Sequence, residues 1–131
     1  MTTDQVSVRY IVDDVDAALA FYTSHLGFTV LSNASPAFAD VVRGSLRLLL
    51  SGPSSSAARP MPDGRKPTPG GWNRIHLIVD DIHAEVANLA RDGGVVFRNE
   101  VITGPGGSQV VFDDPSGNPI ELFQPGHPPA R

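Results

Sequence analysis

The chain contains no cysteine among its 131 residues, and it has one tryptophan and no long hydrophobic run. Without cysteine, disulfide bonds, thiolate metal sites and thiol nucleophiles are all excluded. No apolar stretch approaches the ~20 residues of a membrane-spanning helix, so we expect no membrane partner. The net charge is −4 and no run of Lys or Arg forms a basic patch, which argues against nucleic acid as a partner. Residues 1–6 are polar and lack the apolar core of a signal peptide, so a cytoplasmic location is expected.

Glycine and proline are abundant, with 13 and 12 residues, but they are concentrated in two places. One is the stretch 52–72 near the middle of the chain, and the other is the C-terminal end from Pro125. Neither shows helical or strand periodicity, so both are predicted to be loop or linker. The length suits a single domain, 1–131. We predict that it consists of a first module 5–52, a linker 53–72, a second module 73–125 and a tail 126–131.

The sequence repeats itself across the linker. Residues 10–15, YIVDDV, correspond to residues 77–82, LIVDDI, with an offset of 67 positions. In each copy a β-branched run ends in two aspartates, and apolar residues then recur at helical spacing. The second aspartate of each pair, Asp14 or Asp81, is predicted to be the N-cap of the helix. Both helices are predicted to end near a glycine, Gly27 in the first copy and Gly94 in the second.

Strand-like stretches follow each helix, so each half is predicted to be a βαβββ module. In the first half they are Phe28–Leu31, Ala37–Val42 and Leu46–Leu50, and in the second they are Val95–Arg98, Ser108–Phe112 and Pro119–Phe123. The turn 114–118, DPSGN, has strong hairpin chemistry. The predicted fold is α+β, with two modules that form a curved mixed sheet around a cleft and helices on the outside. A generic α+β repeat such as a ferredoxin-like pair is the alternative.

Two longer motifs favour a particular superfamily. Residues 12–28 begin VDDVDAALAFY and end LGF, and residues 113–125 read DDPSGNPIELFQP. These segments resemble the opening and closing signatures of the glyoxalase / bleomycin-resistance / extradiol-dioxygenase (vicinal oxygen chelate, VOC) superfamily, and the likeness covers roughly residues 5–125. The resemblance implies the paired βαβββ fold and a homodimer. It does not imply one reaction, because the superfamily includes lyases, isomerases, dioxygenases and metal-free drug-binding proteins.

The resemblance also implies where a metal would bind, and this sequence departs from the family there. Metal-dependent members take one ligand from the first strand and one carboxylate from the last strand of each module. The matching positions here are Ser7 and Leu49 in the first half, and Arg74 and Glu121 in the second. Only Glu121 keeps a metal-binding side chain, since a guanidinium has no lone pair to donate. The resemblance therefore leads us to expect no metal cofactor.

Strand alternation identifies further candidates beside Glu121. Arg74 is positioned to pair with Glu121, either as part of a ligand site or as a buried ion pair that fills the vacated position. His76 follows Arg74 by two residues and shares its face. It is a candidate cleft residue, proton shuttle or displaced metal ligand. Alternation also places Phe123 on the face of Glu121.

In the first half, alternation places Arg9 beside Ser7 on one face of the opening strand. Arg47 shares a face with Leu49 on the closing strand. If these faces line the cleft, its arginines favour a ligand with carboxylate, phosphate or enolate character. Phe38 and Trp72 are candidate flat walls for an aromatic ligand, although packing in the core or in a loop is the favoured interpretation of each.

Three functional hypotheses follow. The first is a metal-independent protein that binds a small anionic or aromatic metabolite or antibiotic through Ser7, Arg9, Arg47, Arg74, His76, Glu121 and Phe123. The second is a metal-independent isomerase, lyase or cyclase in which Glu121 or His76 is the catalytic general base. The third is a metal-dependent lyase or dioxygenase with a divalent metal relocated to His76 and Glu121.

Overall fold

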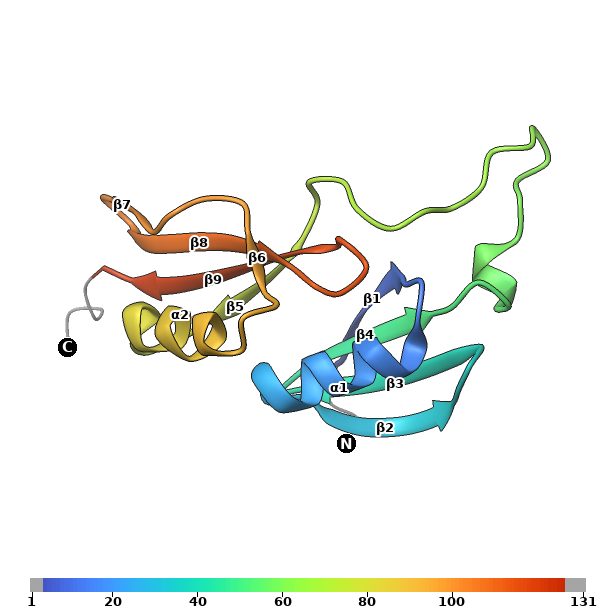
Figure 1. Cartoon of the computed structure of the whole chain (residues 1–131), viewed down its shortest axis with the longest axis horizontal. Coiled ribbons are helices and arrows are strands. Elements are labelled where there is room, and N and C mark those ends of the chain that lie inside the picture. The colour runs from blue at the N-terminus through green and yellow to red at the C-terminus, as the bar shows by residue number, and fades with distance from the viewer. Residues whose placement is uncertain (1–3, 127–131) are drawn as a thin grey trace. The chain divides into compact units, whose positions relative to one another are not determined.

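The structure, a computed structural model, describes residues 4–126 and divides into two compact units. Unit 1 comprises the described residues up to Gly70 together with the turn Pro115–Asn118. Unit 2 comprises Gly71–Asp114 and the described residues from Pro119 onward. Each unit holds one α-helix and one mixed sheet, which confirms the α+β class and the βαβββ plan (Figure 1). The enclosure of a cleft by both sheets stays a prediction. Within residues 4–126, no helix is long and apolar enough to cross a membrane.

Unit 1 contains a four-stranded sheet in the order β1-β4-β3-β2. Its elements are β1 (Val6–Ile11), α1 (Val15–His25), β2 (Thr29–Ala34), β3 (Phe38–Arg43) and β4 (Leu46–Ser51). The edge strand β1 runs parallel to β4, and the other neighbours are antiparallel. Helix α1 packs on one face of this sheet and buries Val15, Ala18 and Tyr22 against it. The opposite face of the sheet carries no helix of unit 1 (Figure 1).

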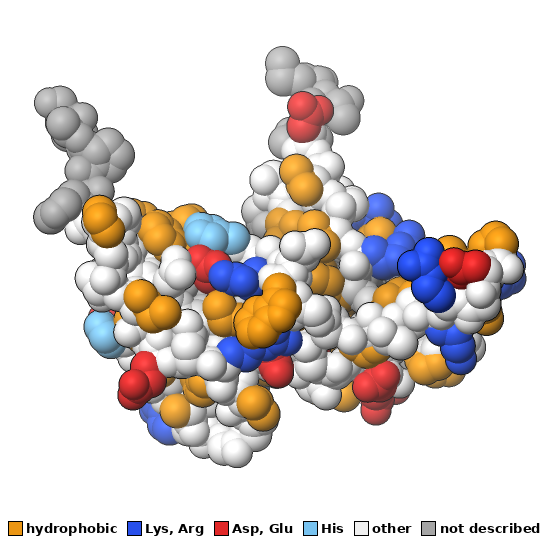
Figure 2. All heavy atoms as spheres, turned by 90° about the horizontal axis from the view of Figure 1, so that it is seen from above, with side chains coloured by type: hydrophobic (Ala, Val, Ile, Leu, Met, Phe, Trp, Pro, Cys, Tyr) orange, Lys and Arg blue, Asp and Glu red, His pale blue; other side chains and the backbone are white. Residues whose placement is uncertain are grey.

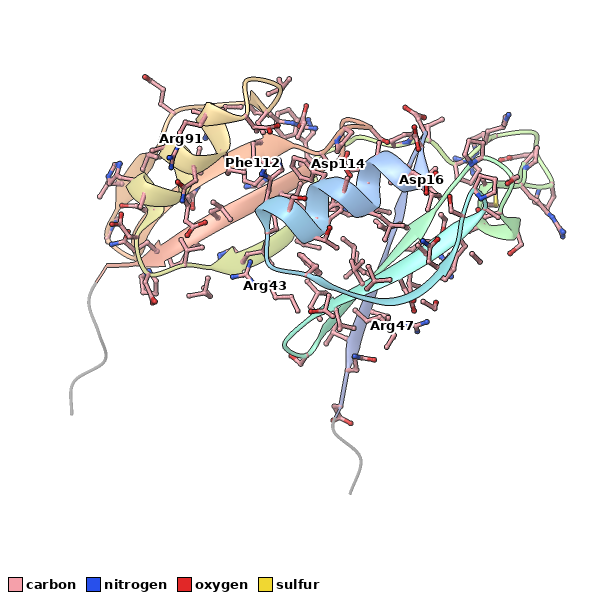
Figure 3. The ribbon with its side chains drawn as sticks, turned by 60° about the horizontal axis from the view of Figure 1, so that its bottom comes forward. Asp16, Arg43, Arg47, Arg91, Phe112 and Asp114 are labelled. Carbon is pink, nitrogen blue, oxygen red and sulfur yellow. The ribbon has the colours of Figure 1, made fainter. Side chains whose placement is uncertain are left out.

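Unit 2 contains a five-stranded sheet with the path β5-β9-β8-β6 and β7 paired to β8. Its elements are β5 (Ile75–Ile78), α2 (Ile82–Arg91), β6 (Val96–Phe97), β7 (Ile102–Gly104), β8 (Gly107–Asp113) and β9 (Pro119–Pro125). The core of this unit lies between α2 and the sheet, where α2 contacts β9 and where Ile82 and Leu89 of the helix and Ile120 and Leu122 of β9 are buried. Phe112, labelled in Figure 3, is fully buried.

Both helices begin as the repeat predicts. The Asp14 side chain accepts a hydrogen bond from the Ala17 backbone N–H, and Asp81 accepts one from Ala84, each at 3.1 Å. These bonds satisfy backbone donors that would otherwise be free in the first turn of each helix. After α1, Gly27 has φ +70°, the left-handed conformation predicted there.

Several predicted boundaries need correction. After α2, the left-handed glycine is Gly93 and not Gly94. Strand β2 extends to Ala34, beyond the predicted end at Leu31, because β3 provides partners along its whole length with one register shift between Val30 and Ser32. The predicted strand at Val95–Arg98 shrinks to the two residues of β6. Strand β7 was not predicted. It pairs with β8 around a tight turn at residues 105–106.

The predicted linker 53–72 contains only a short 3₁₀ helix, η1 (Ser56–Ala58), and turns. The turn that joins β8 to β9 belongs to unit 1, where its side chains form hydrogen bonds with the backbone at the end of β1. The Ser116 hydroxyl accepts from the Asp13 N–H at 2.8 Å. The buried Asn118 donates to the Ile11 carbonyl and accepts from the Gly70 N–H, both at 2.8 Å. Of the predicted tail 126–131, residues 127–131 lie outside the described residues, as do residues 1–3 of the polar N-terminal segment.

Candidate functional site

The exposed face of the unit 2 sheet carries a cluster of polar side chains. Ile75 and Leu77 of β5 point into the core, so His76 and Ile78 point to the opposite face. Strand β9 pairs with β5 in parallel and aligns His76 with Glu121 and Ile78 with Phe123. Partner residues in neighbouring strands project to the same face of a sheet. The two polar side chains His76 and Glu121 and the two apolar side chains Ile78 and Phe123 therefore lie on one face of two adjacent strands. Arg74 lies just before β5.

Arg74 and Glu121 form an ion pair. Arg74 Nε lies 3.0 Å and Nη2 2.9 Å from Glu121 Oε1. Arg74 Nη1 also donates to the Trp72 carbonyl at 3.2 Å, which fixes the guanidinium from a second side. Glu121 is buried, and a buried carboxylate is costly unless a cation and hydrogen bonds compensate it. Arg74 provides that compensation, so the predicted pairing of these residues is present.

His76 completes the cluster. Its Nε2 lies 3.5 Å from Glu121 Oε2, which is longer than an ordinary hydrogen bond between nitrogen and oxygen. The imidazole also packs on Phe123, with ring centroids 5.0 Å apart and planes tilted by 33°. About half of the His76 side chain remains exposed. The ring is thus held in place by an aromatic contact while its polar edge stays open to solvent.

The cluster keeps hydrogen-bonding capacity for a ligand. A guanidinium has five N–H donors. Within residues 4–126, Arg74 uses three of these N–H groups, two toward Glu121 Oε1 and one toward the Trp72 carbonyl. At least two N–H groups are therefore left for a ligand. Among the contacts within residues 4–126, Glu121 Oε2 has only the distant one to His76. The face therefore offers donors from Arg74, an acceptor from Glu121 and a titratable imidazole, next to the apolar surfaces of Phe123 and the exposed Ile78. In the space-filling view, basic, acidic and histidine side chains lie beside hydrophobic ones (Figure 2).

The corresponding face of unit 1 carries the other predicted site residues. Ser7 is exposed on β1, opposite Arg47 of β4. Arg9 donates from Nη1 to the Ser51 hydroxyl at 2.9 Å. Arg47 lies on the face of the sheet away from α1 (Figure 3). It contacts Asp40 Oδ2 through Nη2 at 2.7 Å and Nε at 2.8 Å.

Asp40 was not predicted from the sequence, although it is the most deeply buried carboxylate on this face. Burial alone would raise the pKa of Asp40. Hydrogen bonds from the Ser32 hydroxyl and from Arg47, with the charge of Arg47, outweigh burial and lower the pKa below its ordinary value. The carboxylate thus stays ionised with both oxygens bonded. Its signal in the sequence was the alternation of Phe38, Asp40 and Val42, which places a lone acid between two apolar residues.

The donor set at the four family positions does not fit a divalent metal. Ser7 is a neutral hydroxyl, Leu49 has no donor and Arg74 is a cation, so Glu121 alone has a suitable group. Glu121 Oε1 is also engaged by Arg74. Within residues 4–126, no three side chains among His, Asp and Glu come close enough together to hold a metal ion.

The structure therefore brings Arg74, His76, Glu121 and Phe123 together in unit 2, and places Ser7, Arg9 and Arg47 on one sheet of unit 1. Their roles toward a ligand stay predictions. The sequence interpretation also missed Arg98, which donates hydrogen bonds to the Asp113 carboxylate and to the Gly71 carbonyl in unit 2. A lone arginine in a predicted strand gives no signal for that contact.

Comparison with known proteins identifies the family. A model of the Glyoxalase/Bleomycin resistance protein/Dioxygenase superfamily matches residues 4–122. A solved structure of a member of this superfamily from Sphaerobacter thermophilus is 31% identical, with a TM-score of 0.72, and the match covers 95% of this chain and 98% of that one. Among curated protein sequences, none matches the chain.

Two further solved structures are similar. TnmS3, an antibiotic binding protein from Streptomyces, is 27% identical with a TM-score of 0.69, covering 96% of this chain and 98% of that one. A lactoylglutathione lyase from Agrobacterium tumefaciens is 22% identical with a TM-score of 0.68 and covers 95% of each chain, which supports the fold alone. The family model and the match from Sphaerobacter thermophilus agree with the motifs at 12–28 and 113–125: the chain belongs to the glyoxalase/bleomycin resistance protein/dioxygenase superfamily.

Proposed function

We propose that this protein binds a small organic molecule on the exposed face of the unit 2 sheet, without a bound metal. The observation that carries the proposal is the Arg74–Glu121 pair, in which a buried carboxylate is compensated by an arginine that keeps free donors. The remaining N–H groups of Arg74 are in reach of solvent, because its side chain is 28% exposed, and a ligand oxygen can take the place of water there. Binding sites characteristically combine a few fixed polar groups with apolar surroundings, as this face does.

The polar groups define the chemistry of the ligand. Arg74 is suited to a carboxylate, phosphate or enolate oxygen, because its planar N–H groups match such acceptors. Glu121 is suited to a ligand hydroxyl or N–H group. Phe123 and Ile78 add apolar contact beside them. The proposed ligand is therefore a small acidic metabolite or antibiotic with an apolar or aromatic body.

The absence of a resident metal is part of the proposal. Arg74 pairs with Glu121, the residue at the family's carboxylate ligand position. The positive charge of its guanidinium takes the place of the charge of a metal ion. We expect substoichiometric metal in protein purified without chelator, and no change in metal content after His76→Ala. Stoichiometric metal that is lost in the His76→Ala chain would instead establish a relocated metal site at His76 and Glu121.

The similarity to TnmS3, an antibiotic binding protein, supports a binding role and makes antibiotics the first ligands to test. A screen of antibiotics and aromatic acids by thermal shift, followed by calorimetry, would identify ligands. Arg74→Gln should then weaken binding at least tenfold, because it removes a charge-assisted contact worth about 1.5–3 kcal/mol. Arg91→Gln is the matched control, since Arg91 is an exposed arginine at the end of α2 (Figure 3). Equal affinities in all three chains would refute this site.

A metal-independent isomerase, lyase or cyclase is the second candidate, favoured by the contact between Glu121 Oε2 and His76 Nε2. A carboxylate and an imidazole that face each other can move a proton to and from a bound ligand. In that case Glu121→Gln would abolish turnover of a bound ligand while leaving its binding measurable. Unchanged chemical identity of the ligand after prolonged incubation supports the binding role.

We also propose that the protein is a cytoplasmic homodimer. The edge strands β1 and β5 each pair on one side only within their sheets, and unpaired strand edges favour association. Analytical ultracentrifugation at several concentrations tests the dimer, and a monomer throughout would contradict it.

A further inference from the structure

Trp72 is the most exposed large hydrophobic side chain that the structure describes, with 70% of its surface accessible. It is nevertheless held in place. The guanidinium of Arg98 lies over its ring, 4.6 Å from the centroid, a distance that is typical of a cation–π contact. An exposed indole with a fixed orientation differs from the scattered exposed apolar residues that need no explanation.

Arg98 is itself fixed from two directions. Its Nε donates to Asp113 Oδ1 at 2.6 Å, and its Nη1 donates to the Gly71 carbonyl at 2.7 Å. The Trp72 carbonyl accepts from Arg74. Consecutive backbone carbonyls at the end of the linker are therefore bonded to two different arginines. Both arginines have carboxylate partners in the same sheet, Asp113 of β8 for Arg98 and Glu121 of β9 for Arg74.

The strand register relates these two pairs. In the β8–β9 ladder, Val111 is opposite Glu121 and Asp113 is opposite Pro119. Asp113 and Glu121 therefore share the exposed face, one step apart along it. Trp72 is joined to both pairs, through its ring to Arg98 and through its carbonyl to Arg74. The backbone of Trp72 thus lies next to Arg74, and its indole lies next to Arg98, whose carboxylate partner shares the face of Glu121.

We infer that Trp72 is the specificity-determining residue of this site and stacks on a planar ring of the ligand, while Arg74 binds the acidic group of the same molecule. The inference rests on the proposed function and narrows it to planar aromatic acids. Arg98 covers one side of the indole, so a ligand ring has the other side for an offset stack. Arg98 is a positioning residue here, because it orients the indole without touching the ligand.

The test compares two probes of the same charge and nearly the same size, naphthalene carboxylate and its saturated decalin counterpart. Calorimetry would measure the affinity of both for the full chain, Trp72→Leu, Trp72→Phe and Arg74→Gln. We expect the full chain to bind the aromatic probe about three- to tenfold more tightly than the saturated one, as aromatic stacking predicts. Trp72→Leu should remove this preference, Trp72→Phe should restore part of it, and Arg74→Gln should weaken both probes.

A second readout uses the fact that the chain has a single tryptophan. Its one indole N–H resonance should move on addition of the aromatic probe, through the ring current of a stacked ring, and much less with the saturated probe. Circular dichroism and sedimentation of each variant show whether its fold and oligomeric state are retained.

The outcomes separate the inference from the function on which it rests. In one outcome, Arg74→Gln binds both probes more weakly, but Trp72→Leu keeps the aromatic preference of the full chain. That result would overturn the role of Trp72 and leave the proposed binding site intact. A change of oligomeric state in Trp72→Leu would assign the indole to a contact between copies and overturn its role as well. If Arg74→Gln binds both probes as the full chain does, or if neither probe binds, both proposals fail.

Discussion

Replacing Arg47 by methionine should destabilise unit 1 in a way that depends on pH. The substitution keeps most of the aliphatic volume and removes the cation from Asp40, which is only 2% exposed. Loss of one partner from a fully buried ion pair costs about 3–5 kcal/mol. Arg47 retains 35% of its side-chain exposure, so solvent screens part of the charge, and the Ser32 hydroxyl still donates to Asp40. We expect a loss of about 2 kcal/mol at neutral pH.

The sign of the pH dependence follows from the direction of the pKa shift. In the native chain the pKa of Asp40 is lowered, so its contribution to stability is present above the unfolded pKa, about 3.9, and is lost as pH falls through the folded value. Without Arg47, the charge and the hydrogen bond that offset burial are lost, so the pKa of Asp40 in the folded chain is higher. The difference in unfolding free energy between the two chains should therefore be greatest near neutral pH and shrink as pH falls through the folded pKa of Asp40 in each chain.

Urea unfolding followed by circular dichroism at pH 7 and pH 3.5 measures these differences. The matched control is Arg65→Met, because Arg65 pairs with Asp63 at the same 2.7 Å but the two side chains are 84% and 54% exposed. An exposed pair contributes about 0.2–1 kcal/mol at most. If Arg47→Met and Arg65→Met cost the same at both pH values, burial of Asp40 does not control the energetics as argued.

Other predictions concern the stability of the two units. Asp14→Ala and Asp81→Ala each remove a helix N-cap and should cost about 1 kcal/mol in urea unfolding, whereas Asp80→Ala, at an exposed residue beside the cap, should cost almost nothing. Equal effects at Asp80 and Asp81 would contradict the capping assignment. Asn118→Ala leaves the Ile11 carbonyl and the Gly70 N–H without their partner and should cost about 2 kcal/mol. Thermal unfolding measures this loss, and an unchanged midpoint would show that water replaces the amide.

Local chemistry explains why so much of the fold could be predicted from the sequence. The two aspartate pairs are followed by helically spaced apolar residues, and Asp14 and Asp81 cap their helices as that pattern implies. The DPSGN segment forms the predicted turn between β8 and β9. Each of these signals depends on residues within a few positions of one another, so no knowledge of distant contacts is required.

The errors lie where distant partners decide the structure. Strand β7 has only three residues and exists because β8 pairs with it, so its own sequence, Ile102–Gly104, contains no strand pattern. The length of β2 is likewise set by β3. In the site, the pairing of Arg74 with Glu121 was accessible because both positions align with family signatures. The pairing of Asp40 with Arg47 was not, because it depends on the register of the β3–β4 hairpin.

The two modules place a carboxylate on strands that are not equivalent. In unit 2 the acid is Glu121 on β9, opposite Val111 of β8. In unit 1 the position equivalent to Glu121 is Leu49, and the acid is its cross-strand neighbour Asp40 on β3. The first module thus has an arginine–carboxylate pair on its exposed sheet face, but its acid lies on β3, one strand away from the position equivalent to Glu121.

Asp40 and Glu121 differ in how easily a ligand could reach them. Asp40 is nearly inaccessible, and both of its oxygens accept bonds from Ser32 and Arg47. Glu121 keeps one oxygen whose contact, at 3.5 Å to the half-exposed His76, is long. A ligand can therefore displace the long His76 contact of Glu121 more easily than it could break the ion pair of Asp40. We predict one ligand per chain, measured by calorimetric titration. Two equivalent ligands per chain, one of them lost in Arg47→Met, would show that the unit 1 face also binds.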